Sequence, residues 1–389
     1  MSPFNRRRFL RNTGLSILPT LLPAVSAIAN EKSQLPQAAK VIRFFADSAP
    51  LEVGEYAELL REINLKHSIV KDRYGAGGVV AELENKFLQV TGKERAIFLP
   101  SGTMANQFAL AEHSGSNTKI FVQDTSHVYR DEADAAQSVF QKRLMPLAKN
   151  ETAFTAAQLK DAIDHLSEEE VFASGVGAVS IENPVRRTSG RMISIDEIKK
   201  ISAYCKEKNI KLHLDGARIY IASAWSGISI KEYASHFDSI YISLYKYLGA
   251  PSGAILCGDK NLIDQIPHLM KIHGGSMYGN WTNAALALHH METAEESWKR
   301  IKQRADLLFP ELNKISGIQI NALSSGTNIY SLVLANTING GRFAEKLNRD
   351  FNIRIGRINS NTTEMTVNET LLYQNIDFVT NAFRAAVMG

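Results

Sequence analysis

Two strand-like segments of this 389-residue chain end in charged residues that could do chemistry together. Residues 211–214 predict a strand that leads into Asp215, and residues 239–244 predict one that leads into Lys246. Because open α/β sheets bind ligands at the carboxyl ends of their strands, we expect both side chains in one crevice. A lysine forms an imine with an aldehyde, and a carboxylate keeps a pyridine nitrogen protonated. The pair therefore fits a pyridoxal cofactor, although Lys246 alone would be taken for a solvated surface lysine.

A third segment predicts an anion site at the start of a helix. Residues 95–99 predict a strand, and Ser101, Gly102 and Thr103 follow it at the start of a helical pattern over 101–114. Free backbone N–H groups and the helix dipole attract phosphate there, and glycine allows close approach. Serine and threonine are also the commonest helix caps, so this segment alone leaves simple capping open.

The elements that must position these residues alternate along the chain. Apolar runs predict strands at residues 95–99, 119–122, 177–181, 211–214, 239–244 and 254–257. Helical patterns between them cover residues 101–114, 195–209 and 230–234. This alternation predicts an α/β fold with a largely parallel sheet covered on both faces.

The pattern changes after about residue 279. A long helical stretch over 283–312 is followed by strand-like pieces at 317–321 and 328–334. We therefore predict a large domain over 30–290 and a smaller α+β domain over 291–389.

Composition excludes several classes of protein. Four of the arginines behind the net charge of +4 lie within the first eleven residues, so the remainder is nearly neutral and nucleic acid is not an expected partner. Cys205 and Cys257 are too few for a disulfide framework and have no metal-ligand spacing, so we expect two buried core residues and no metal site.

The first 29 residues are typical of a signal peptide. Arg6, Arg7 and Arg8 are followed by Phe-Leu-Arg and an apolar run over 15–28, with small residues up to Ala29. Two prolines interrupt the run, and it is shorter than the roughly 20 residues of a membrane span. The arginines resemble the twin-arginine class, which implies recognition by that export machinery and a periplasmic location. An uncleaved basic tail is the alternative.

Together these segments resemble the fold-type-I pyridoxal-phosphate enzymes, and within them the threonine aldolase and β-eliminating lyase family. Residues 98–106 look like the family's phosphate-binding segment, which includes Ser101, Gly102 and Thr103. The run His-Leu-Asp-Gly-Ala-Arg over 213–218 is similar to its most recognisable motif. The resemblance implies that Asp215 meets the pyridine nitrogen, that Arg218 lies beside the cofactor and that Lys246 carries it as a Schiff base.

Further roles also come from the resemblance. His127 is similar to a histidine that stacks on the cofactor ring and serves as, or positions, a base. Asn183 lies in a segment that approaches substrate and cofactor, and Tyr74 in an N-terminal active-site turn. The likeness is close over residues 74–279 and loose beyond them.

Two departures concern binding arginines. Where the family usually shows an arginine that reaches a neighbouring subunit's phosphate, only Lys271 is present, and lysine lacks a planar fork. Residues 363–368 hold no arginine for the substrate α-carboxylate, a role for which Arg186, Arg354 and Arg357 are the substitutes considered.

The resemblance implies an enzyme that cleaves a β-hydroxy-α-amino acid to glycine and an aldehyde. Catalysis would rest on Lys246, His127 and Asp215. A β-eliminating lyase and an aminotransferase remain alternatives, because the fold does not fix the reaction. A protein that binds an amino acid or a vitamer without turnover is the non-enzymatic alternative. A homodimer or homotetramer is expected.

Overall fold

The computed structural model describes residues 40–388. The predicted signal segment lies outside these residues. Val41–Gly389 form one compact unit, so the predicted boundary near residue 290 stays a prediction. Over the described part of the chain, no helix combines the length and apolar character that a membrane crossing requires.

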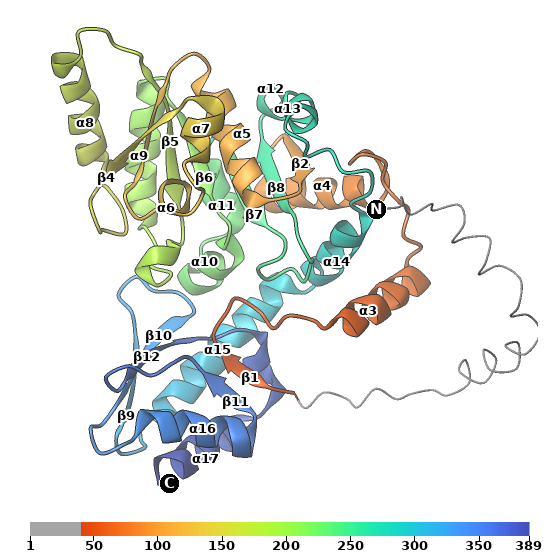
Figure 1. Cartoon of the computed structure of the whole chain (residues 1–389), viewed down its shortest axis with the longest axis vertical. Helices are drawn as coiled ribbons and strands as arrows, with labels where there is room; N and C mark the ends of the chain where they lie inside the picture. The colour runs from red at the N-terminus through yellow and green to blue at the C-terminus, as the bar shows by residue number, and fades with distance from the viewer. Residues whose placement is uncertain (1–39, 389) are drawn as a thin grey trace, which may run out of the picture. The chain divides into compact units, whose positions relative to one another are not determined.

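The largest sheet of the described chain has seven strands (Figure 1). In spatial order they are β2 (Arg95–Leu99), β8 (Ala254–Gly258), β7 (Ser239–Ser243), β6 (Lys211–Asp215), β5 (Val176–Glu182), β3 (Lys119–Gln123) and β4 (Arg143–Leu147). Pairing is parallel from β4 to β7, whereas β8 runs antiparallel to both of its neighbours. The predicted α/β fold with a mostly parallel sheet is confirmed.

Successive residues of β2 show how helices cover this sheet. Phe98 belongs to the apolar cluster that contains Leu83 of α4 (Gly78–Thr91), and Leu99 to the cluster that contains Ala105 of α5 (Gly102–Ser114). Neighbouring side chains of a strand point to opposite faces. The two helices therefore cover opposite faces, which is why strands such as β3 and β7 are buried along their whole length.

Apart from α3, which contacts α14, the remaining helices of this part of the chain connect and surround the strands (Figure 1). They are α3 (Val53–Lys66), α6 (His127–Arg130), α7 (Ala135–Phe140), α8 (Ala156–Glu169), α9 (Ile195–Glu207), α10 (Ile219–Ser226), α11 (Ile230–Ser235), α12 (Lys260–Ile263), α13 (Ile266–Ile272), α14 (Trp281–Met291) and the 3-10 turn η1 (Arg186–Thr188).

The C-terminal part is built on smaller sheets. An antiparallel sheet has the order β12 (Thr362–Thr366), β10 (Ile329–Leu334), β9 (Ile318–Ala322), and β1 (Ile42–Phe44) pairs in parallel with β11 (Ile353–Ile355). The helices of the C-terminal part are α15 (Ala294–Leu312), α16 (Gly340–Phe351), α17 (Ile376–Val387) and the 3-10 turn η2 (Glu369–Tyr373). Strand β1 thus ties the beginning of the described chain to its end.

One helical stretch and two strands illustrate how the structure differs from the sequence-based expectation. The helical stretch predicted over 283–312 is two helices, α14 and α15, separated at Glu292 and Thr293. Strand β4 was not predicted, because Pro146 and the exposed Arg143 weaken its pattern. Strand β1 is only three residues long, and its partner β11 lies some three hundred residues away in the sequence.

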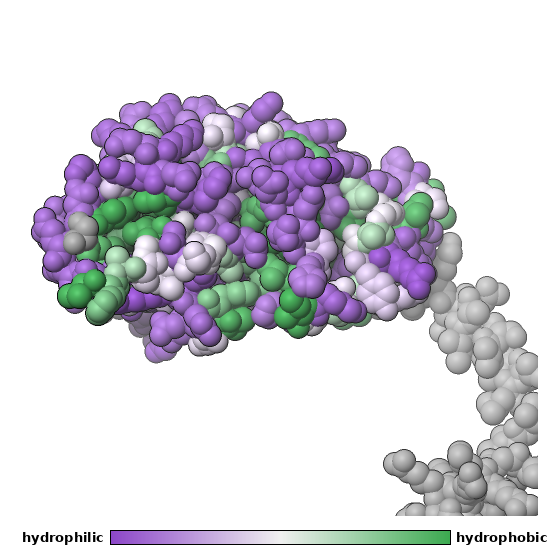
Figure 2. Space-filling model, turned by 90° about the horizontal axis from the view of Figure 1, so that it is seen from above, coloured by the Kyte–Doolittle hydropathy of each residue, from purple (hydrophilic) through white to green (hydrophobic). Residues whose placement is uncertain are grey.

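Apolar side chains are mostly enclosed, and Cys205 and Cys257 are buried free thiols, as predicted. On the face seen in Figure 2, hydrophobic residues stand in groups among hydrophilic ones. The exposed apolar residues include Tyr74, Met277 and Tyr278, which are 51%, 53% and 68% exposed. Exposed apolar groups of this kind are typical of contact surfaces.

Candidate active site

Lys246 lies three residues beyond β7, and its side chain is nearly enclosed, with the residue 9% exposed. Among the described residues its Nζ makes no hydrogen bond or ion pair, and it lies 5.8 Å from the centroid of the Tyr245 ring. Burial, and to a smaller extent the Arg218 cation, lowers the pKa of Lys246 to about 8. Such an amine is unprotonated for a useful fraction of the time near neutral pH, as imine formation requires.

Asp215 is the last residue of β6 and is 1% exposed. Its Oδ1 accepts a hydrogen bond from the Ala217 backbone N–H (3.1 Å) and its Oδ2 accepts one from Asn106 Nδ2 (3.0 Å). Asp215 is also among the charges that act on Lys246, so the two residues share one electrostatic environment. The two residues follow neighbouring, paired strands, as the predicted convergence requires, and the shared crevice stays a prediction.

Arg218 does not point freely to solvent. Its Nε and Nη2 donate to the two carboxylate oxygens of Asp47 at 2.8 and 2.9 Å. The pair comes from the segment after β1 and from the turn before α10, so the N-terminal segment completes this side of the site.

A cavity of about 260 Å³ opens beside these residues. It is lined by Pro100, Ser101, Gly102, Thr103, His127, Tyr241, Tyr245, Pro251, Ser252 and Gly253. The predicted anion segment thus forms its floor, at the start of the thirteen-residue helix α5. Lys246 and Asp215 are buried and are not part of the lining. Each adjoins a tyrosine that is: Tyr245 precedes Lys246 in sequence, and Tyr241 pairs with Asp215 across the sheet.

The start of α5 is shaped for close approach. Ser101 caps the helix, since its Oγ accepts a hydrogen bond from the Met104 N–H at 3.3 Å. A Cβ on Gly102 would lie 1.9 Å from Tyr241 Oη, so only glycine fits. Capping and anion binding are therefore compatible here: the serine caps the helix, and Gly102 and Thr103 of the first turn line the cavity.

These groups fit pyridoxal 5'-phosphate as a bound cofactor. The unpaired Lys246 amine suits its aldehyde, the buried Asp215 carboxylate suits a protonated ring nitrogen, and the start of α5 suits a phosphate. The Ser126 hydroxyl, next to the cavity-lining His127, is buried without a hydrogen-bond partner among the described residues, which leaves one donor for a ligand.

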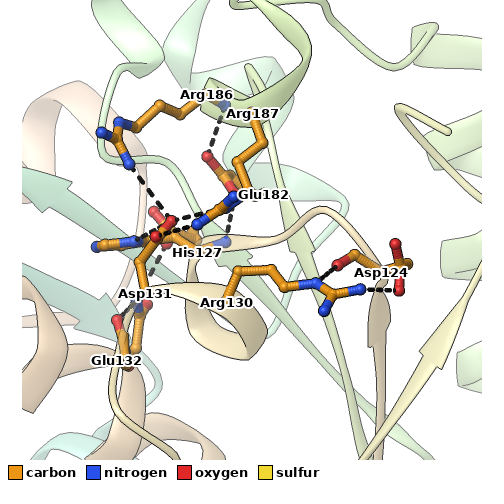
Figure 3. A network of polar contacts seen from close by, with 10 residues as sticks. Asp124, His127, Arg130, Asp131, Glu132, Glu182, Arg186 and Arg187 are labelled. Carbon is orange, nitrogen blue, oxygen red and sulfur yellow. Dashed lines mark hydrogen bonds and ion pairs between the residues drawn. The ribbon is translucent and has the colours of Figure 1, made fainter. Parts of the chain in front are cut away.

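His127 belongs to a polar cluster that Figure 3 shows from close by. Its Nδ1 lies 3.3 Å from Asp131 Oδ2. Arg187 donates to both oxygens of that carboxylate, and Arg186 Nη1 is 3.4 Å from it. Arg187 and, to a smaller extent, His127 lower the pKa of Asp131. The carboxylate is therefore an anion that faces three basic side chains.

A second carboxyl fixes the backbone under this cluster. Glu182 Oε2 accepts from the His127 N–H (2.7 Å) and Oε1 from the Arg186 N–H (2.8 Å). Burial, followed by repulsion from Asp215, raises the pKa of Glu182 to about 7. Glu182 thus ties the turn that carries His127 to the turn that carries Arg186.

The other predicted site residues occupy different positions. Asn183 is buried and its Oδ1 accepts a hydrogen bond from the Ile193 N–H (2.9 Å), so its side chain holds a loop and does not line the cavity. Tyr74 is half-exposed, with its ring edge-on to Tyr278 and Lys271 Nζ 5.4 Å above it. Arg357 is exposed between β11 and β12, away from the cavity lining.

Sequence reasoning missed a buried network behind Asp215. Asn106 Nδ2 also donates to Glu132 Oε1 (2.9 Å), and its Oδ1 lies 3.0 Å from His213 Nε2. His213 Nδ1 in turn lies 2.7 Å from Ser239 Oγ. The signal that could have revealed it is polar residues inside otherwise apolar strands and a helix, at positions that burial would normally exclude.

Comparisons with known proteins agree with this geometry. Residues 57–335 match the family model described as beta-eliminating lyase. The low-specificity L-threonine aldolase of Candida albicans is 32% identical over 70% of this chain and 72% of its own length. Low-specificity L-threonine aldolase 1 of Arabidopsis thaliana is 24% identical over 85% of this chain and 93% of its own.

Solved structures show the same fold. A protein of Listeria monocytogenes assigned as an L-allo-threonine aldolase superposes with a TM-score of 0.74 at 25% identity, over 89% of this chain and 97% of that one. The threonine aldolase of Leishmania major gives a TM-score of 0.68 at 19% identity, over 89% and 98% of the two chains. The family match spans well over half of the residues, and the chain therefore belongs to the beta-eliminating lyase family.

Proposed function

We propose that this chain is a pyridoxal-phosphate-dependent aldolase that cleaves a threonine-like β-hydroxy-α-amino acid to glycine and an aldehyde. The observation that carries the proposal is the buried Lys246 amine, unpaired among the described residues, beside the Asp215 carboxylate and a helix start that can hold phosphate. The names of the Candida albicans and Arabidopsis thaliana relatives support the choice of reaction.

Each residue has a defined task in this proposal. Lys246 would hold the cofactor through its aldehyde, Asp215 would keep a proton on the ring nitrogen, and Ser101, Gly102 and Thr103 would bind the phosphate. When bound, the cofactor delocalises the electron pair that bond cleavage leaves on the substrate Cα. Arg218 stays paired with Asp47 and fixes the wall beside the ring.

Aldol cleavage also needs a base for the substrate β-hydroxyl. His127 lines the cavity, and its Nδ1 faces Asp131, which leaves Nε2 to take the hydroxyl proton as the Cα–Cβ bond breaks. We assign Arg186 to the substrate α-carboxylate. Its contact with Asp131 is long, at 3.4 Å, whereas Arg187 holds the Asp131 carboxylate with two hydrogen bonds and is therefore already engaged.

The test is turnover of threonine, allo-threonine and phenylserine by the purified chain. Release of glycine and the matching aldehyde, lost in Lys246→Ala, supports the proposal. Saturable amino acid binding with no product from any of them would instead indicate a binding protein.

β-Elimination is the second candidate, since the family description names it. It would expel a leaving group from Cβ after loss of the Cα proton, and the product would be an oxo acid with ammonia. Serine and cysteine as substrates distinguish the two reactions, because only elimination releases pyruvate from them. Transamination would require an oxo acid as the acceptor of the amino group. The same assay detects it when such an oxo acid is added and its conversion to an amino acid is measured.

We further propose that the protein is exported by the twin-arginine route and works in the periplasm as a homodimer or homotetramer. The arginines and apolar run of residues 1–29 support export, and the exposed Tyr74, Met277 and Tyr278 support subunit contact. Replacing Arg6, Arg7 and Arg8 by lysine should retain the protein in the cytosol, as cell fractionation would show. Light scattering of the mature protein tests the assembly.

A further inference from the structure

Two buried carboxyl groups, Glu132 and Asp215, are joined by a single amide. Asn106 Nδ2 donates to Glu132 Oε1 at 2.9 Å and to Asp215 Oδ2 at 3.0 Å. All three residues are buried: Asn106 is 0% exposed, Glu132 4% and Asp215 1%. Two buried carboxyl groups that accept from the same amide repel each other when both are ionised, so we expect the pair to share one proton, held by one group at a time.

The orientation of the Asn106 amide is fixed from behind. The opposite orientation would turn the amide oxygen toward both carboxyl groups, and so the oxygen must face His213 Nε2, 3.0 Å away. His213 Nε2 therefore carries the single ring proton, and His213 Nδ1 accepts a hydrogen bond from the Ser239 hydroxyl, whose Oγ is 2.7 Å away. Burial lowers the pKa of His213 to about 3, which keeps the ring neutral.

A further histidine completes this chain of hydrogen bonds. Ser239 Oγ is also 2.7 Å from His113 Nε2. Because the Ser239 proton is directed at His213, His113 Nε2 must be the donor to Ser239. Burial lowers the pKa of His113 to about 4, so this ring is neutral as well. The four residues therefore have one consistent arrangement of protons, which ends in the Asn106 N–H groups.

The two carboxyl groups are not equivalent. Asp215 accepts a second hydrogen bond, from the Ala217 N–H at 3.1 Å, whereas Oε2 of Glu132 is buried without a hydrogen-bond partner among the described residues. Burial is the main cause that raises the pKa of Glu132 to about 8, with repulsion from Asp215 adding to it. Glu182, the third carboxyl nearby, is already engaged with the His127 and Arg186 N–H groups.

We propose that Asn106, held by His213 and Ser239, is a positioning residue that directs the shared proton to Glu132 and keeps the Asp215 carboxylate charged and aimed at the ring nitrogen of the cofactor. This inference rests on the proposed function, because the proposed function makes the ring nitrogen of the cofactor the partner of Asp215. It assigns to Glu132 the part of a neutral acid and not of a second anion. His213 and Ser239 act only through the Asn106 amide.

The first test is the protonation state of the bound ring. Pyridoxal 5'-phosphate labelled with ¹⁵N in its ring is bound to the full chain, and the nitrogen chemical shift separates the protonated from the unprotonated ring. Wild type and Glu132→Gln should both give the protonated signal, because the amide of the introduced glutamine imitates a neutral acid. Asn106→Leu should shift the signal toward the unprotonated ring and weaken cofactor binding about tenfold, the effect of losing a hydrogen bond to a charged group.

The double variant Asn106→Leu with Glu132→Gln should move the signal back toward wild type, since no second carboxyl remains to compete for the charge. Asn328→Leu is the matched control: Asn328 is 3% exposed and donates to the Val367 carbonyl at 2.8 Å, in the C-terminal sheet. It loses a buried amide but should leave the signal unchanged. An unaltered signal in Asn106→Leu overturns the inference and leaves the proposed function intact.

The second test does not depend on the cofactor or on the folding of Asn106→Leu. The infrared difference between wild type and Glu132→Gln at pH 7 should contain the carbonyl stretch of a protonated carboxyl group. Its absence would show that Glu132 is ionised and would contradict the inference. Failure of wild type to bind pyridoxal 5'-phosphate would overturn the proposed function and this inference together.

Discussion

Nδ1 of His127 lies 3.3 Å from Oδ2 of Asp131, and two hydrogen bonds from Arg187 hold that carboxylate in place. The relationship places a carboxylate beside the imidazole that lines the cavity (Figure 3). It joins α6 to the turn η1, two elements separated by more than fifty residues of sequence. A base held in this way presents the same nitrogen to each substrate.

Replacing Asp131 by asparagine should therefore lower kcat/KM for threonine cleavage on the order of 10²-fold, within the range that general acid–base catalysis contributes. Asp161→Asn is the control, because Asp161 lies 3.6 Å from His165 with the same spacing of four residues on the exposed face of α8. Steady-state kinetics of both variants decide the matter. Equal kcat/KM values in the two would mean that Asp131 does not orient a base.

Arg186→Ala should raise KM for the amino acid substrate about tenfold, the effect of losing one charge-assisted hydrogen bond, and change kcat little. Arg357→Ala should leave both constants unchanged, because the contact with Asp131 that places Arg186 next to His127 has no counterpart at Arg357 among the described contacts. If Arg357→Ala raised KM and Arg186→Ala did not, the assignment of the substrate carboxylate would be reversed.

The alanine variant of Gly102 should lose about 1–3 kcal/mol of stability, as overpacked sites do. The new Cβ would meet Tyr241 Oη at 1.9 Å, and the start of α5 would have to move away from the cavity. Cofactor affinity should fall with it. Gly341→Ala, in α16, meets only Asn339 Oδ1 at 3.4 Å and should be nearly neutral. Thermal melting and cofactor titration compare the two, and similar losses would contradict the steric argument.

The stability of the protein should depend on pH through Glu132. Its folded-state pKa of about 8 lies above the unfolded value of 4.5, so the folded state retains a proton that the unfolded chain releases. The contribution of Glu132 to the free energy of unfolding is therefore largest below pH 4.5. It decreases as the pH rises from 4.5 to 8 and does not recover above pH 8. Glu132→Gln should be the more stable form by roughly 1–3 kcal/mol at pH 8 and no more stable at pH 4. Urea unfolding at the two pH values measures this, and a pH-independent difference would count against it.

Much of the fold was accessible from sequence because its strands are short, apolar and buried on both faces. The segments that became β3, β7 and β8 carry this pattern without interruption. Strand β1 was not accessible, since three residues carry no periodicity and its partner β11 is distant in the chain. Strand β4 is partly exposed and contains Pro146, which breaks the pattern that strands usually show.

The same contrast holds in the site. Asp215, Lys246 and the segment after Pro100 were predicted because each follows a strand, where an α/β sheet binds its ligands. Asn106 and His213 were not predicted as a pair, because their contact depends on how α5 lies over β6. Arg186 and Arg357 both lie outside the cavity lining, and charge alone suggested them. The three-dimensional arrangement separates the two, because Arg186 joins the His127 cluster through Asp131.

The most direct test of the proposed chemistry is the visible absorption spectrum of the purified protein before and after borohydride reduction, for wild type and Lys246→Ala, followed by addition of threonine, allo-threonine and phenylserine. We predict an imine band that is fixed by borohydride, absent in Lys246→Ala, and shifted by a substrate that releases glycine. A wild-type protein that shows no such band after addition of pyridoxal 5'-phosphate would contradict the assignment of Lys246 as the residue that holds the cofactor.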